Sequence, residues 1–90
     1  MINSAIKLLL VEDHKLMRVG LKSLFEEQDG LEVTSEAQSG HEAIEKFKTT
    51  HPDVTLMDIG LPDMSGIEAT KKVKALNKDI KIVVLTSHND

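Results

Sequence analysis

The chain has 90 residues, which suits one small domain (residues 1–90) and leaves too little material for a second core. Eleven lysines and arginines against fifteen aspartates and glutamates leave a net charge of −4, which argues against a nucleic-acid-binding surface. The sequence has no cysteine, no apolar run long enough to span a membrane and no evident signal peptide, so we expect a cytoplasmic domain.

The beginning of the chain predicts a buried strand followed by an amphipathic helix. Residues 7–11 run without polar alternation, which is typical of a parallel strand that is covered on both faces. Apolar residues then recur at helical spacing over residues 14–27, and Asp13 is placed to cap the first turn. The apolar stripe of this helix consists of Met17, Leu21, Leu24 and Phe25.

The next stretch predicts an edge strand and a second helix. Apolar and polar residues alternate over residues 31–37, which favours a strand with one exposed face. Ser39 and Glu42 have the spacing of a capping box, which indicates the start of a helix that ends before Pro52. The inner face of this helix is predicted to carry Ala43, Ile44 and Phe47.

The remaining residues predict two more strands with a helix between them. Residues 54–57 indicate a buried strand, and residues 59–64 a loop. Ser65 and Glu68 form a second capping box, and residues 80–85 indicate a fourth strand. The apolar stripe of the third helix consists of Ala69, Val73 and Leu76.

Strands that alternate with helices predict an α/β fold with a parallel sheet, right-handed crossovers and helices on both faces. The half-polar strand at residues 31–37 belongs at an edge, and the apolar strands before and after it belong inside. A strand order of 2-1-3-4 satisfies both requirements and matches the start of the flavodoxin-like arrangement. The fourth strand is as apolar as an interior strand, although no later strand is predicted to cover its outer edge.

Polar side chains follow three of these strands, and parallel strands place all their carboxyl ends at one edge. Glu12 and Asp13 follow the first strand, Asp58 the third, and Thr86 and Ser87 the fourth. Two unit charges ~4 Å apart repel by about 4 kcal/mol at an effective dielectric of ~20, so clustered carboxylates require a compensating charge. Oxygen ligands without His or Cys favour Mg²⁺.

Asp58 is the best candidate nucleophile because it ends a central strand opposite the Glu12–Asp13 pair. A carboxylate beside Mg²⁺ can attack a phosphoryl group and form an acyl phosphate. Gly60 lets the backbone come close to the ion, so its carbonyl is a candidate ligand. The sequence therefore predicts a magnesium-dependent phosphoryl-transfer site.

Each of these residues also has a simpler structural interpretation. Asp13 alone would be a helix cap, Glu12 a solvated acid, Asp58 a cap for the turn before Pro62, and Thr86 and Ser87 polar strand ends. Their coincidence at one edge of one sheet favours a shared site. The four histidines show no ligand spacing and are expected at the surface or in turns, although the one next to the acidic pair could tune the site; they are His14, His41, His51 and His88.

Three stretches carry a specific pattern: LLVEDH at residues 9–14, DVTLMDIGLPDMSG at residues 53–66 and VLTS at residues 84–87. The pattern resembles the receiver domain of bacterial two-component response regulators, of the NarL/LuxR type, and extends over essentially the whole chain. The resemblance implies a flavodoxin-like (CheY-like) fold in which Asp58 is the phosphoacceptor for a sensor histidine kinase. Asp13, Asp58 and the Gly60 carbonyl would hold Mg²⁺, with Glu12 acting through water.

The resemblance also implies contacts to the phosphoryl group from the fourth strand. The Thr86 hydroxyl would turn toward the phosphoryl group, and the Ser87 backbone N–H would donate to one of its oxygens. Receivers of this type continue through a further helix, a fifth strand with a lysine, and a last helix, and their parent proteins carry a DNA-binding helix-turn-helix domain. We therefore interpret the chain as a receiver truncated after its fourth strand, and expect homo-oligomers by element exchange or by pairing of uncovered faces.

Three functions compete at this point. The first is a phosphoacceptor domain that catalyses at most its own phosphorylation and dephosphorylation. The second is a non-phosphorylated interaction or oligomerisation module. The third, a small Mg²⁺-dependent phosphatase, is disfavoured because Gly60 stands where a second catalytic acid would be needed.

Overall fold

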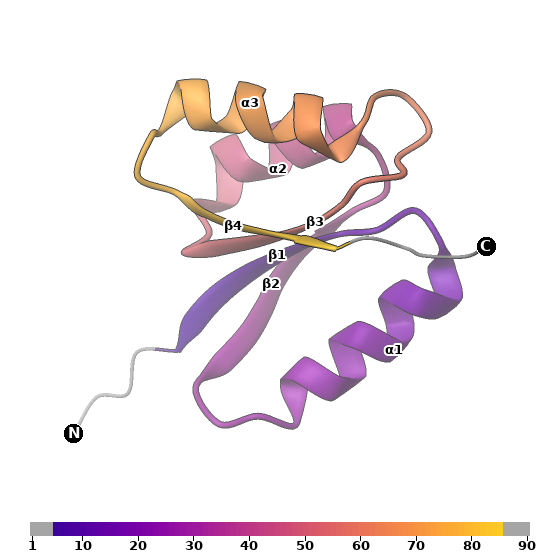
Figure 1. Cartoon of the computed structure of the whole chain (residues 1–90). Helices are drawn as coiled ribbons and strands as arrows, with labels where there is room; N and C mark the ends of the chain where they lie inside the picture. The colour runs from indigo at the N-terminus through magenta and orange to yellow at the C-terminus, as the bar shows by residue number, and fades with distance from the viewer. Residues whose placement is uncertain (1–4, 86–90) are drawn as a thin grey trace.

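The computed structural model describes residues 5–85 and forms a four-stranded parallel sheet with three helices (Figure 1). The strand order is β2-β1-β3-β4, which confirms the predicted order of 2-1-3-4. Within residues 5–85, every helix is too short or too polar to traverse a lipid bilayer. In chain order the elements are β1 (Ile6–Val11), α1 (Lys15–Glu26), β2 (Leu31–Ala37), α2 (Gly40–Thr50), β3 (Val54–Asp58), α3 (Gly66–Leu76) and β4 (Lys81–Leu85).

The helices cover the two faces of the sheet unequally: α2 and α3 lie side by side on one face, and α1 lies alone on the other (Figure 1). β1 is covered from both sides, as its uninterrupted apolar sequence predicts. Its residues Leu9 and Val11 belong to the core beneath α2 and α3. Leu8 and Leu10 belong to the smaller core beneath α1. The half-polar β2 is an edge strand, as predicted.

The starts of α2 and α3 follow the predicted capping boxes, whereas the start of α1 does not follow the prediction. Ser39 Oγ accepts from the Glu42 N–H and Ser65 Oγ from the Glu68 N–H, each at 3.1 Å. The N-cap of α1 is His14, not Asp13, and no side chain caps it. The prediction for Asp13 is wrong because the backbone is still extended at His14, which delays the helix by one residue.

The predicted apolar stripes are only partly buried. In α1, Leu21 and Phe25 pack against the sheet, whereas Met17 and Leu24 remain 49% and 59% exposed. The prediction is therefore wrong for Met17 and Leu24, because α1 lies alone on its face and no neighbouring helix within residues 5–85 covers its flanks. It is also wrong for Leu76, which lies at the very end of α3 and is exposed. Within residues 5–85, β4 is the outer strand, and it pairs with β3 alone.

Candidate metal and phosphoryl-acceptor site

The site lies at the carboxyl edge of the sheet, where β1 and β3 end side by side. Val11 pairs with Met57 in the parallel ladder, so the residues that follow them leave the sheet together. Glu12, Asp13, His14 and Asp58 each offer a ligand atom, and these atoms all lie within 4.8 Å of one another. The structure thus brings together the three carboxylates that the sequence singled out.

Two of the carboxylates in this cluster are buried, where an ionised group loses its hydration. The Glu12 and Asp58 residues are only 2% and 1% exposed. Burial raises the pKa of Asp58, and the negative charges of Glu12 and Asp13 raise it further, while a hydrogen bond from Gly60 N–H opposes them. A bound cation would therefore favour the ionised form of Asp58.

Two oxygens of the cluster suit a hard cation. Within the described part of the chain, Asp58 Oδ2 and Asp13 Oδ1 are buried and accept no hydrogen bond. Buried carboxylate oxygens normally have partners, because an unpaired charge is costly to desolvate. The oxygens of the three carboxylates match the ligand preference of Mg²⁺. The residues present therefore fit the predicted ion.

His14 belongs to the cluster, which its spacing in the sequence did not indicate. Its Nδ1 lies 2.9 Å from Glu12 Oε2 and 3.3 Å from Asp13 Oδ1, and its backbone N–H donates to the same Glu12 oxygen. The hydrogen bond with Glu12 and the charge of Asp13 raise the pKa of His14. His14 thus lies at the surface, as expected of the histidines, and contacts the Glu12 carboxylate from the exposed side of the site, which fits the alternative that it tunes the site.

Arg18 is a residue beside the site that sequence reasoning missed. Its Nη1 donates to the Glu12 carbonyl oxygen at 2.8 Å, and its Nε lies 3.3 Å from Glu36 Oε1. Lys22 Nζ lies 3.0 Å from the other oxygen of Glu36. These contacts connect α1 to β2 and fix the turn that carries the acidic pair. The only sequence signal was a basic residue five positions after Asp13, in the predicted helix.

The loop after β3 is tight, and glycine is required at its end. The Gly60 N–H donates to Asp58 Oδ1 at 3.3 Å, and the Gly66 N–H donates to the Ile59 carbonyl at 2.8 Å. A Cβ on Gly66 would lie 2.2 Å from the Asp58 carbonyl oxygen, so a side chain there would displace the backbone. The role of the Gly60 carbonyl as a ligand stays a prediction.

The predicted contacts from the fourth strand lie outside the described residues. β4 ends at Leu85, which pairs with Asp58, and the Ile59 N–H donates to the Leu85 carbonyl at 3.1 Å. Thr86 and Ser87 follow immediately in the sequence, but they lie beyond residues 5–85. Their proposed roles stay predictions.

A parallel sheet of this order with clustered acids at its carboxyl edge is typical of signalling receivers, and the comparisons agree. The response regulator receiver domain family matches residues 8–90. The response regulator GacA of Pseudomonas syringae is 43% identical over 81 residues, which cover 90% of this chain and 38% of GacA. VraR of Staphylococcus saprophyticus is 45% identical over 83 residues, covering 92% of this chain and 40% of VraR.

Solved structures show the same likeness. A LuxR-family two-component response regulator from an Aurantimonas species superposes with a TM-score of 0.90 at 35% identity, covering 96% of this chain and 61% of that one. The response regulator TrrA of Thermotoga maritima, solved in complex with Mg²⁺ and BeF, superposes with a TM-score of 0.84 at 34% identity. The match covers 92% of this chain and 70% of that one. The chain therefore belongs to the family of response regulator receiver domains, and its relatives place it with the NarL/LuxR type. It spans about two fifths of the length of the curated relatives named above.

Proposed function

We propose that Asp58 accepts a phosphoryl group from a sensor histidine kinase, with Mg²⁺ held beside it. The observation that carries this proposal is the buried Asp58 carboxylate, which has an unpaired oxygen and lies within the acidic cluster. Bound Mg²⁺ would neutralise charge that develops on the phosphoryl oxygens. Asp13, Asp58 and the Gly60 carbonyl would hold the ion, and Glu12 would act through water.

The proposed transfer is a single displacement at phosphorus. A carboxylate oxygen of Asp58 forms the new O–P bond, the P–N bond to the kinase histidine breaks, and its electron pair leaves with the imidazole. Hydrolysis of the acyl phosphate returns Asp58 to its starting state. The domain then catalyses only its own phosphorylation and dephosphorylation. The Thr86 hydroxyl and the Ser87 N–H would contact the bound phosphoryl group.

We further propose that the whole protein is a cytoplasmic transcription regulator that contacts DNA through a separate domain. The relatives are response regulators, and this chain spans only part of their length. Its net charge of −4 disfavours direct DNA contact by the receiver itself. In this arrangement the phosphorylation state of Asp58 would control the DNA-binding part.

The test is the intact mass of the protein after incubation with Mg²⁺ and acetyl phosphate. We expect a gain of one phosphoryl group that Asp58→Ala abolishes and that chelation of Mg²⁺ prevents. Asp53→Ala is the matched control, because Asp53 accepts the Lys7 N–H outside the acidic cluster. If the wild-type protein gains no mass, the alternative of a non-phosphorylated interaction module is favoured instead.

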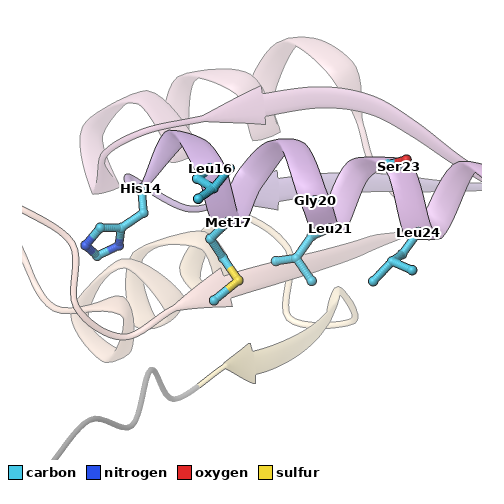
Figure 2. A pocket seen from close by; sticks show the side chains of 7 residues that line it. All are labelled: His14, Leu16, Met17, Gly20, Leu21, Ser23 and Leu24. Atoms are coloured by element: carbon cyan, nitrogen blue, oxygen red, sulfur yellow. The ribbon is translucent and has the colours of Figure 1, made fainter.

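A second proposal concerns self-association through α1. Figure 2 shows Met17, Leu21 and Leu24 projecting from the same side of this helix, where they line an open groove with Gly20. Exposed apolar side chains that line a groove favour an interaction site there, and a twofold pair of copies would cover the groove in both partners at once. Exposed Val83 and Val84 on β4 offer a second surface for exchange or pairing.

Sedimentation velocity at increasing concentration tests this association. We expect a dimer whose population falls in Leu24→Gln, which removes apolar surface from the groove. Leu76→Gln is the control, since Leu76 is similarly exposed but lies on α3 at the other face of the sheet. A monomer at every concentration would refute the association and leave the phosphorylation proposal untouched.

A further inference from the structure

The loop between β3 and α3 is attached to the start of α2 by a carboxylate. Asp63 Oδ1 accepts the Gly40 N–H at 2.8 Å, and Asp63 Oδ2 accepts the His41 N–H at 2.9 Å and contacts His41 Nδ1. These partners are more than twenty residues away in the sequence. Helix N-termini present free N–H groups and a positive dipole end, so a carboxylate binds them well.

Side-chain packing joins the same two segments independently. A Cβ on Gly40 would lie 2.3 Å from Met64 Cγ, so the absence of a side chain at Gly40 makes room for Met64. Met64 in turn packs against the core beneath α2 and α3. The loop is therefore held to α2 by Asp63 and Met64 together.

Asp63 adds to a cap that α2 already has. Ser39 already accepts the Glu42 N–H as the local cap of this helix. The two hydrogen bonds from Gly40 and His41 satisfy first-turn N–H groups that Ser39 does not reach, and they also tie the loop to the helix. Their charge-assisted character lowers the pKa of Asp63 far below its ordinary value.

The restrained loop is the one that leads from Asp58. Within it, Gly60 bridges to Ser65, and the Gly66 N–H donates to the Ile59 carbonyl. Through these two links, a displacement at Asp63 would reach the Asp58–Gly60 segment. Asp63 itself is not among the acidic groups that cluster within 4.8 Å.

We propose that Asp63 is a positioning residue for the acceptor site: by binding the start of α2, it keeps the Asp58–Gly60 segment in the geometry that binds Mg²⁺. This proposal rests on the proposed phosphoacceptor function for its activity readout, but the restraint itself can be measured without metal. Partners outside the ligand set commonly change metal affinity by about 10- to 100-fold when they are removed.

The experiment compares Asp63→Ala with Asp53→Ala. Both variants remove an aspartate that accepts backbone N–H groups, but Asp53 accepts the Lys7 N–H and does not contact the loop after β3. Amide hydrogen exchange without metal is the first readout, and we expect faster exchange of the Gly60 and Gly66 amides only in Asp63→Ala. The second readout is the Mg²⁺ concentration that gives half-maximal phosphorylation, which we expect to rise about tenfold in the same variant.

The rate at saturating Mg²⁺ should change little, because Asp63 does not contact the phosphoryl group in this proposal. Asp63→Asn should restore part of the affinity for Mg²⁺, since its amide oxygen can still accept one N–H. The same variant replaces Asp63→Ala in the comparison if the alanine variant does not fold. The proposal is overturned if the folded Asp63 variants match Asp53→Ala in both exchange and Mg²⁺ dependence. If the wild-type protein is not phosphorylated at all, the hydrogen-exchange comparison still shows whether Asp63 restrains the loop.

Discussion

On one face of the sheet, α2 and α3 bury Ala43, Phe47 and Val73, whereas on the other face α1 contributes only half-buried or exposed side chains within residues 5–85. The acidic site lies between these regions. The densely packed side supplies Asp58 and its loop, and the sparsely covered side supplies the Glu12–Asp13 turn. The comparison indicates that the loop after Asp58 is held mainly by apolar packing beneath α2 and α3, whereas the Glu12–Asp13 turn is held mainly by polar contacts from His14 and Arg18.

The two phenylalanines provide the largest test of this comparison, because each lies under a different face. Phe47→Ala removes a buried ring and is expected to lower the free energy of unfolding by about 3–5 kcal/mol. Phe25 is only half-buried, so Phe25→Ala should cost about 1–2 kcal/mol. Urea unfolding at low temperature measures both, with Phe47→Leu in reserve if the alanine variant is unfolded. Equal losses would contradict the difference between the faces.

Two glycines give the next largest contrast. Gly66→Ala places a Cβ against the Asp58 carbonyl oxygen and should cost on the order of 3 kcal/mol, as strained sites do. Gly20 lies inside α1 with open space around it, so Gly20→Ala should stabilise the protein by about 0.5–1 kcal/mol. Thermal unfolding should show a lower unfolding temperature for Gly66→Ala and a higher one for Gly20→Ala than for the wild type. A loss of stability in Gly20→Ala would mean that α1 is covered more closely than described.

Replacing the acceptor itself should have a smaller effect whose sign depends on metal. Burial and the neighbouring charges raise the pKa of Asp58, so its ionised form opposes folding when no cation is bound. Asp58→Asn should therefore raise the unfolding temperature by a few degrees in a chelator. The same variant should lose the stabilisation that Mg²⁺ gives to the wild-type protein. Differential scanning calorimetry with and without Mg²⁺ measures both effects, and Asp53→Asn is the control.

The smallest expected effects concern how stability depends on pH, and they have opposite directions for Asp63 and His14. The pKa of Asp63 is lowered from 3.8 by the N–H groups of α2, so its contribution to stability is complete above that value and is lost as the pH falls below it. The pKa of His14 is raised from 6.5 by Glu12 and Asp13, so its contribution is complete below 6.5 and is lost as the pH rises through the raised pKa. Stability profiles of Asp63→Asn and His14→Gln should converge with the wild type at low and at high pH, respectively.

Much of the fold could be predicted because its signals are local. The caps at Ser39 and Ser65 act within four residues, and both serines accept the N–H three residues on, as predicted. The uninterrupted apolar sequence of β1 indicated a central strand, and the alternation in β2 indicated an edge. Asp13 failed as a cap because competing contacts in the turn, such as Glu12 with the His14 N–H, shift the start of α1 by one residue.

The candidate site could be predicted only in part. Its carboxylates follow strand ends, and the parallel topology alone brings those ends to one edge. The roles of Arg18 and Asp63 could not be predicted, because both depend on contacts between segments that are distant in the chain or on the exact turn of a helix. The position of His14 directly after the acidic pair suggested that it could tune the site, but only the structure shows its contacts with the Glu12 and Asp13 carboxylates.

By itself, the sequence determined the order of the elements, the parallel sheet and the set of acids at its edge. These follow from periodicity and from residue types at strand ends, which are properties of short stretches of chain. The tertiary structure alone decided which apolar residues of α1 reach the sheet, that Gly66 touches the Asp58 backbone, and that Asp63 binds the start of α2. Those outcomes depend on how closely separate segments approach in space, a quantity set by the packing of the whole domain.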